Sequence, residues 1–177
     1  MPQDDGACRH LPGKPMPSYR LQTTDHRVID FSTLPGWVVL YCYPMTGQPG
    51  VALPDGWDAI PGARGCTAQS CGFRDHFAEL KSLDVQVYGM SAQSTAYQQE
   101  AVDRLHLPFA LVSDDGLGLT DALGLPTFEV GGARLNKRVT LIVQDGVISK
   151  YFYPVFPPDR NIEDVLDWLN ANRNRTV

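Results

Sequence analysis

The sequence has 177 residues, of which 43% are hydrophobic and 20% are charged, as in an ordinary globular domain with its own core. A net charge of −5, without any run of Lys or Arg, argues against nucleic acid or an anionic membrane as the main partner. No apolar run approaches the ~20 residues of a membrane helix. The first ten residues lack a basic then apolar secretory pattern, so a cytoplasmic location is the default expectation.

The chain opens with a proline-rich segment. Residues 1–17 contain four prolines and little periodicity, which predicts an extended N-terminal arm. The remainder, residues 18–177, has the length of one domain. At its start, residues 19–31 predict two short strands around a turn near Asp25 and His26.

An apolar strand pattern and a long loop come next. The run WVVLYCY, Trp37 to Tyr43, is apolar and β-branched, as expected of a strand buried on both faces. Pro44 ends it. Residues 44–65 hold five glycines and four prolines, which predicts a loop. Loops beyond ~12–15 residues are uncommon unless they are functional or disordered, so this one is a candidate for function.

From Cys66 onwards, helical and strand patterns alternate. Apolar residues at three- and four-residue spacing predict a helix that begins at Cys66. Such alternation, with one hairpin, implies an α/β fold with a central mixed β-sheet flanked by helices. The other predicted elements are a strand over 85–91, a helix over 94–107 with Ser94 as N-cap, a strand over 109–114, a short helix over 115–125, a hairpin over 138–154 and a helix over 161–172.

Two of the four cysteines, Cys66 and Cys71, lie five residues apart on the predicted helix. The thiolate is the reactive form of cysteine, and free N–H groups at a helix N-terminus stabilise it. Cys66 has this position, and Arg64 adds a positive charge two residues earlier. Five residues of ideal helix separate Cα atoms by roughly 8–9 Å, whereas a disulfide needs them within ~7 Å. The pair is therefore either inert helix packing or a redox pair whose helix must unwind.

The other candidate residues favour structural roles. A zinc site is disfavoured because His76, Cys8 and His10 have no second metal-ligand pair at a usable spacing. Cys42 lies in the apolar strand and is expected to be a buried hydrophobe. Cys8 lies in the N-terminal arm. The sequence leaves open whether its thiol is exposed and whether it forms a disulfide with another molecule. Trp57 is expected to anchor the loop against the body, with a position beside the thiol as the alternative.

Four stretches of the chain follow the order of one family's motifs. The stretch GCTAQSCGFRD matches the end of a loop pattern Pro-x-x-x-Thr-Pro-Gly-Cys, with a second Cys five residues later and then Gly-Phe-Arg-Asp. The stretches YGMSAQS, LPFALVSD and RVTLIVQDGVI match the strands that follow. From about Tyr19 to Leu169 the chain thus resembles a peroxiredoxin of the bacterioferritin-comigratory or Q type. The resemblance implies a thioredoxin-like fold and thiol-dependent reduction of hydrogen peroxide or organic hydroperoxides, without metal, haem or another cofactor.

The resemblance also implies roles for individual residues. Cys66 takes the place of the peroxidatic thiol that attacks the O–O bond, and Cys71 that of the resolving thiol, which forms an intramolecular disulfide with it. Arg138 takes the place of the family arginine, which would stabilise the thiolate and hydrogen-bond the peroxide oxygens. Thioredoxin or a similar dithiol would reduce the disulfide. The expected assembly is a monomer or a weak homodimer.

The loop departs from the family pattern. When Pro44 is aligned with the family proline, Val51 stands at the place of the cysteine. The simplest description is an insert at about residues 51–65 that displaces the cysteine to Cys66. The family threonine is missing from its place, and Thr46 or the amide of Gln48 could supply its hydrogen bond. Pro44 and Thr46 are therefore the candidate substrate-binding residues.

Two other functions stay open on the residues alone. A dithiol oxidoreductase acting on protein disulfides would have the same fold, but such proteins carry C-x-x-C rather than the C-x4-C found here. Alternatively, the insert has disabled the site and the domain is a non-catalytic binding module.

Overall fold

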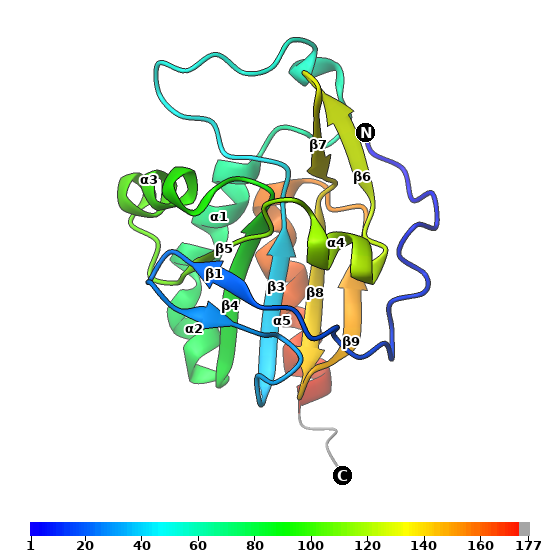
Figure 1. Ribbon diagram of the computed structural model, residues 1–177. Helices are drawn as coiled ribbons and strands as arrows, with labels where there is room; N and C mark the ends of the chain where they lie inside the picture. The colour runs from blue at the N-terminus through cyan, green and yellow to red at the C-terminus, as the bar shows by residue number, and fades with distance from the viewer. Residues whose placement is uncertain (174–177) are drawn as a thin grey trace.

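The computed structural model describes residues 1–173 and confirms the predicted central mixed sheet flanked by helices (Figure 1). Seven strands pair in the order β2-β1-β5-β4-β3-β8-β9, with β3, β4 and β5 parallel and the other pairs antiparallel. These strands are β1 Leu21–Thr23, β2 Val28–Ile29, β3 Trp37–Cys42, β4 Val85–Ser91, β5 Leu111–Ser113, β8 Val139–Gln144 and β9 Val147–Phe152.

Helices cover both faces of the sheet. In Figure 1, α4 lies in front of the sheet, and α1, α2 and α5 lie behind it. Within the described residues, the α-helices are α1 Cys66–Asp75, α2 Phe77–Ser82, α3 Thr95–Leu105, α4 Gly118–Leu123 and α5 Asn161–Asn172. The helix predicted from Cys66 is interrupted at His76, which separates α1 from α2. Ser94 caps α3 as predicted, because its side chain accepts a hydrogen bond from the Tyr97 backbone N–H.

Strand β3 explains why its sequence is a continuous apolar run. Successive side chains of a strand point to opposite faces, and both faces of β3 are covered. Val38, Leu40 and Cys42 pack in the core on the α4 side, whereas Val39 and Tyr41 pack in the core with α1, α2, α3 and α5. Its carboxyl end leads into the loop before α1, as in other open α/β sheets whose sites lie at strand ends.

The pairing of β8 with β3 brings a distant residue to this end of the sheet. Because β8 runs antiparallel to β3, its first residue, Val139, pairs with the last residue of β3, Cys42. Arg138 directly precedes β8 and therefore lies beside the start of α1. The hairpin from β8 to β9 turns at Asp145 and Gly146, both with positive φ (48° and 79°), as the predicted type I′ turn requires.

The N-terminal segment, predicted as an extended arm, packs against the body of the domain. Cys8, Leu11 and Met16 are all buried in the core on the α4 side. The segment also bonds to β9, because the Gly13 N–H donates to the Ile148 carbonyl. The sequence left the exposure of Cys8 open, and the structure shows this residue to be 1% exposed. Nothing in the sequence indicated this packing, because the segment is rich in proline and its buried residues follow neither helical nor strand spacing. These residues are Cys8, Leu11 and Met16.

A small second sheet was missed by the sequence analysis. β6 Thr127–Val130 and β7 Ala133–Asn136 form an antiparallel hairpin around Gly131-Gly132. Figure 1 shows it beside the loop between β3 and α1. The buried ring of Trp57, in the short 3-10 helix Trp57–Ala59 of that loop, packs on Phe128 of β6 with a centroid distance of 6.1 Å. Trp57 thus anchors the insert, as the first interpretation predicted.

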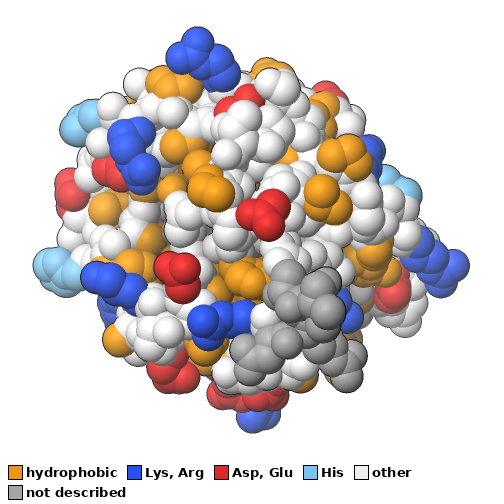
Figure 2. All heavy atoms as spheres, turned by 90° about the horizontal axis from the view of Figure 1, so that it is seen from below, with side chains coloured by type: hydrophobic (Ala, Val, Ile, Leu, Met, Phe, Trp, Pro, Cys, Tyr) orange, Lys and Arg blue, Asp and Glu red, His pale blue; other side chains and the backbone are white. Residues whose placement is uncertain are grey.

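At the end of the molecule opposite this loop, the surface of the described residues carries no patch of side chains of one charge. Figure 2 shows positive and negative side chains interspersed on that face. Within residues 1–173, no helix is long and apolar enough to cross a membrane.

Cys8 gives a prediction about thiol reactivity. Burial raises the pKa of the Cys8 thiol from its usual value of 9.0 to about 12, because the thiolate is poorly solvated inside the core. We therefore expect Cys8 to resist iodoacetamide at pH 8 in the folded protein, while the partly buried Cys71 is labelled. The neutral thiol favours folding below about pH 9, and this contribution is lost as the pH rises towards 12. Mass spectrometry of the labelled peptides measures the rate at which iodoacetamide modifies Cys8 and Cys71. Equal labelling of the two cysteines would contradict the burial of Cys8.

Candidate active site

Cys66 is the first residue of α1 and is 4% exposed. The chain enters the helix through Gly65, whose φ of 106° is a conformation that L side chains rarely adopt. A Cβ atom at Gly65 would also lie 2.7 Å from Cγ of Pro158. Both the backbone conformation and the lack of space therefore require glycine at this position. No side chain caps α1, which leaves N–H groups of its first turn free beside the Cys66 sulfur.

Arg138 contacts the Cys66 sulfur. Its Nη2 lies 3.2 Å from Sγ of Cys66 and also donates to the carbonyls of Gly62, Ala63 and Arg64, at 3.2, 3.3 and 3.1 Å. The loop before α1 therefore wraps around one end of the guanidinium and holds it against the sulfur. Because guanidinium is always protonated and the pair is buried, its charge acts on the sulfur at low effective dielectric. The guanidinium is thus placed to act on charge that develops at the Cys66 sulfur.

A buried polar network orients Arg138 from the other side. Its Nη1 donates to Oε1 of Gln69, one turn along α1, at 2.6 Å. The Gln69 amide then donates to Oδ1 of Asn161 at 3.0 Å, and Thr140 of β8 donates to the same oxygen at 2.7 Å. Gln69 was not singled out from the sequence, because a glutamine inside a helix carries no local signal. Its partner at position 138 becomes visible only when β8 is placed beside α1.

Aromatic side chains form the apolar wall of the site. Tyr41 stacks on Phe73 of α1, with ring centroids 4.6 Å apart and planes 9° apart. Its hydroxyl lies 3.0 Å from Oγ of Ser70. Burial raises the pKa of both Tyr41 and Tyr43 well above the usual value for tyrosine, so both rings stay neutral. The charge next to the sulfur therefore comes from Arg138.

Cys71 lies on the same helix as Cys66 and carries a free thiol. It is partly exposed and packs against the core behind the sheet. Five residues of intact helix keep the two Cα atoms roughly 8–9 Å apart. The structure thus brings Cys66 and Arg138 together but leaves Cys71 out of reach of Cys66 while α1 is folded.

The other predicted site residues are placed less directly. Pro44 is buried at the end of β3 and lines a cavity with Arg138. The Thr46 hydroxyl and backbone N–H both lie within hydrogen-bond range of Oε1 of Gln93, at 3.5 and 3.2 Å, so Thr46 ties the loop to the segment after β4. The Arg64 side chain pairs with Asp58 on the surface at 2.6 Å, and its charge is not at the sulfur as the sequence suggested.

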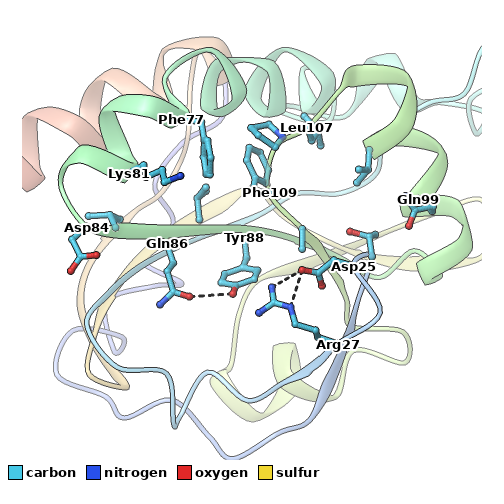
Figure 3. Close-up of a pocket in the computed structure, with 16 residues that line it drawn as sticks. Asp25, Arg27, Phe77, Lys81, Asp84, Gln86, Tyr88, Gln99, Leu107 and Phe109 are labelled. Atoms are coloured by element: carbon cyan, nitrogen blue, oxygen red, sulfur yellow. Dashed lines mark hydrogen bonds and ion pairs between the residues drawn. The ribbon is translucent and has the colours of Figure 1, made fainter.

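A larger cavity than this one lies elsewhere. A cavity of about 510 Å³ borders β4, with Phe77, Leu107 and Phe109 on one side and Tyr88 and Arg27 on the other (Figure 3). None of the predicted site residues lines it. Within residues 1–173, no group of three or more His, Cys, Asp or Glu side chains is arranged to hold a metal ion.

The comparison with protein families decides the classification. Residues 11–166 match the redoxin family. The chain belongs to that family. This redoxin is 28% identical, over 160 residues, to the chloroplastic peroxiredoxin Q of Oryza sativa subsp. japonica, and the match covers 90% of the chain and 66% of the rice protein. It is also 28% identical over 133 residues to peroxiredoxin Q of Arabidopsis thaliana, covering 75% of the chain and 54% of that protein.

Solved structures show the fold of this redoxin. Peroxidoxin BcpB from Mycobacterium tuberculosis superposes with a TM-score of 0.75 at 22% identity, covering 93% of this chain and 99% of that protein. Peroxiredoxin Q from Xanthomonas campestris superposes with a TM-score of 0.71 at 20% identity, covering 92% and 96%. The predicted thioredoxin-like fold and the resemblance to the bacterioferritin-comigratory or Q type are thereby confirmed.

Proposed function

We propose that this redoxin is a thiol-dependent peroxidase in which Cys66 reduces hydrogen peroxide and organic hydroperoxides. The observation that carries the proposal is the 3.2 Å contact between Nη2 of Arg138 and Sγ of Cys66 at the N-terminus of α1. A buried cation and free helix N–H groups stabilise both a thiolate and the negative charge that develops on a peroxide oxygen. One of the Xanthomonas campestris structures is described as concerned with alkyl peroxide reduction, which supports the same chemistry.

The proposed reaction has three steps. The Cys66 thiolate attacks the terminal oxygen of ROOH, so an S–O bond forms, the O–O bond breaks, and RO⁻ leaves and takes up a proton as ROH. The Cys71 thiol then attacks the sulfur of the resulting sulfenic acid, a disulfide forms, and water leaves. A dithiol reductant finally transfers two electrons and two protons to the disulfide and regenerates both thiols.

The test follows the reduced protein through one oxidation. The protein is mixed with one equivalent of hydrogen peroxide in the presence of dimedone, and the modified cysteine is located by peptide mass spectrometry. We expect the dimedone adduct on Cys66, and without dimedone a Cys66–Cys71 disulfide. A first adduct on Cys71 would contradict the assigned roles, and a protein that leaves the peroxide unconsumed would support the binding-module alternative.

The proposal extends to partners and location. We propose thioredoxin or a similar dithiol as reductant, a monomer or weak homodimer as assembly, and the cytoplasm as location. The family supports a dithiol reductant, because an intramolecular disulfide needs two electrons from outside. Turnover assays with thioredoxin and with glutaredoxin test the reductant, sedimentation equilibrium tests the assembly, and cell fractionation tests the location. An insulin-reduction assay without peroxide separates this function from a dithiol oxidoreductase.

A further inference from the structure

The segment Pro158–Ile162 packs directly on α1, the helix that carries Cys66 and Cys71. It contains the 3-10 helix Pro158–Arg160 and the first two residues of α5. In Figure 1, α1 and α5 lie on the same side of the sheet. The two cysteines are too far apart for a disulfide while α1 is folded. The segment therefore contacts the helix that has to unwind before that disulfide can form.

Two glycines mark the places where this contact is tightest. A Cβ atom at Gly65 would lie 2.7 Å from Cγ of Pro158. A Cβ atom at Gly72 would lie 3.3 Å from the Asp159 carbonyl oxygen and 3.3 Å from Cγ2 of Ile162. Ile162 is 2% exposed, so its side chain is enclosed beside Gly72. The segment thus contacts the chain directly before α1 begins and again in the second half of the helix.

A hydrogen bond joins the same two parts between the glycines. The Gln69 side-chain amide donates to Oδ1 of Asn161, the first residue of α5, at 3.0 Å. Successive helical residues are about 100° apart, so the two glycines and Gln69 lie within roughly 60° of one another on one face of α1. The residues that must unwind, from Cys66 to Cys71, lie between the two glycines and include the donor of this hydrogen bond.

We propose that Pro158–Ile162 is a clamp on α1 that sets how fast Cys71 reaches the oxidised Cys66. This inference rests on the proposed peroxidase function and assigns positioning residues to its second step. While the clamp holds α1 folded, the sulfenic acid at Cys66 stays out of reach of Cys71. A second ROOH can then transfer one oxygen atom to that sulfur, so an S–O bond forms, the O–O bond breaks, ROH leaves and a sulfinic acid remains. A tighter clamp therefore leaves Cys66 more open to inactivation by excess peroxide.

Ile162→Ala tests the clamp, because it removes Cγ2 from the contact at Gly72. Truncation of a buried isoleucine weakens its contacts by more than tenfold. Part of this loss falls on α1, so we expect formation of the Cys66–Cys71 disulfide to become roughly tenfold faster. Pro158→Ala loosens the other end of the clamp, where the side chain is only partly buried, and should give a rise of roughly twofold to fivefold.

Quenched-flow mass spectrometry separates the two steps of the reaction. The rate of the first oxidation is proportional to the peroxide concentration, whereas the rate of disulfide formation is not. The first rate constant should be unchanged in both variants, because the contacts of Arg138 with Gln69 and Cys66 involve neither altered residue. Disulfide formation and the second oxidation compete for the same sulfenic acid. The peroxide concentration that converts half of Cys66 to sulfinic acid should therefore rise by the same factor as the rate of disulfide formation.

Ile148→Ala is the matched control for Ile162→Ala. Ile148 is 1% exposed and packs in the core on the α4 side, on the face of the sheet away from α1. The same truncation destabilises the domain there without altering the clamp, so the rate of disulfide formation should be unchanged in the folded protein. An equal rise in Ile148→Ala and Ile162→Ala, or no rise in either Ile162→Ala or Pro158→Ala, would overturn the clamp.

Hydrogen exchange tests the clamp without peroxide. The Gln69 N–H donates to the Gly65 carbonyl at 2.9 Å, so its exchange reports opening of the first turn of α1. In the reduced protein, we expect this amide to exchange roughly tenfold faster in Ile162→Ala than in Ile148→Ala. Equal exchange in the two variants would overturn the clamp. Failure of the peroxidase proposal looks different, because Cys66 would then form no sulfenic acid while the exchange rates still differ.

Discussion

Cys66→Ser is expected to abolish peroxide consumption, whereas Cys71→Ser should consume one equivalent and then stop. A serine hydroxyl is a far weaker nucleophile than a thiolate, and no other cysteine contacts Arg138. In Cys71→Ser the first step is intact, but the sulfenic acid at Cys66 has no partner for condensation. The measurement is peroxide remaining per mole of protein, with and without thioredoxin and its reductase.

Cys8 and Cys42 provide the controls for this pair. Burial raises the pKa of both thiols, to about 12 for Cys8 and higher for Cys42, so neither is expected to react at neutral pH. Cys8→Ala and Cys42→Ala should therefore retain turnover in the fraction of protein that folds. Sustained turnover in Cys71→Ser would show that another thiol or the reductant itself resolves the sulfenic acid.

Formation of the Cys66–Cys71 disulfide requires α1 to lose its first turns. This unwinding would break the Arg138–Gln69 hydrogen bond and the contact between the hydroxyls of Ser70 and Tyr41. The end of the helix is fixed more firmly, because Phe73 is fully buried against Tyr41. We expect oxidation to reduce the far-UV circular dichroism of the protein by a fraction corresponding to part of one helix and to leave the sheet signal unchanged. An oxidised protein with an unchanged spectrum would place the disulfide elsewhere.

Local patterns predicted the elements near the site well. The apolar run from Trp37 to Tyr43, the Asp145-Gly146 turn and the helix at Cys66 each carry their signal within a few residues. The β6–β7 hairpin was missed although Gly131-Gly132 is a recognised turn pair, because the strands on either side, TFEV and ARLN, alternate only weakly.

Long-range contacts were beyond the reach of the same patterns. The placement of Arg138 beside Cys66 depends on the register of β8 against β3, and its partner Gln69 depends on the packing of α1 on that edge. The resemblance to the family named Arg138, but it could not show that the Arg64 side chain turns outward to Asp58. Nor could it show that the first residues of the chain reach the active site, because their anchor is irregular in sequence and is formed by burial alone.

Arg138→Lys is expected to lower the rate of Cys66 oxidation by about 10²–10³-fold, the usual cost of removing a preorganised donor from a developing oxyanion. Lysine keeps the charge but carries a point ammonium in place of the planar guanidinium. A single ammonium cannot hold Gln69, the loop carbonyls and the sulfur at once, as Nη1 and Nη2 do here. The rate constant comes from stopped-flow oxidation by hydrogen peroxide, with the melting temperature as a check on folding.

Arg64→Lys is the matched control for Arg138→Lys. The Arg64 side chain is 71% exposed and pairs with Asp58, so the exchange should leave the oxidation rate unchanged. A comparable loss in both variants would mean that any exchange of arginine for lysine near the loop slows the reaction, and that the donor at the sulfur is not what controls it. Gln69→Leu separates position from charge at Arg138 itself. It removes the 2.6 Å contact at Nη1 but leaves the guanidinium in place, so we expect an intermediate loss of rate, and recovery in Gln69→Glu would identify Gln69 as a positioning residue.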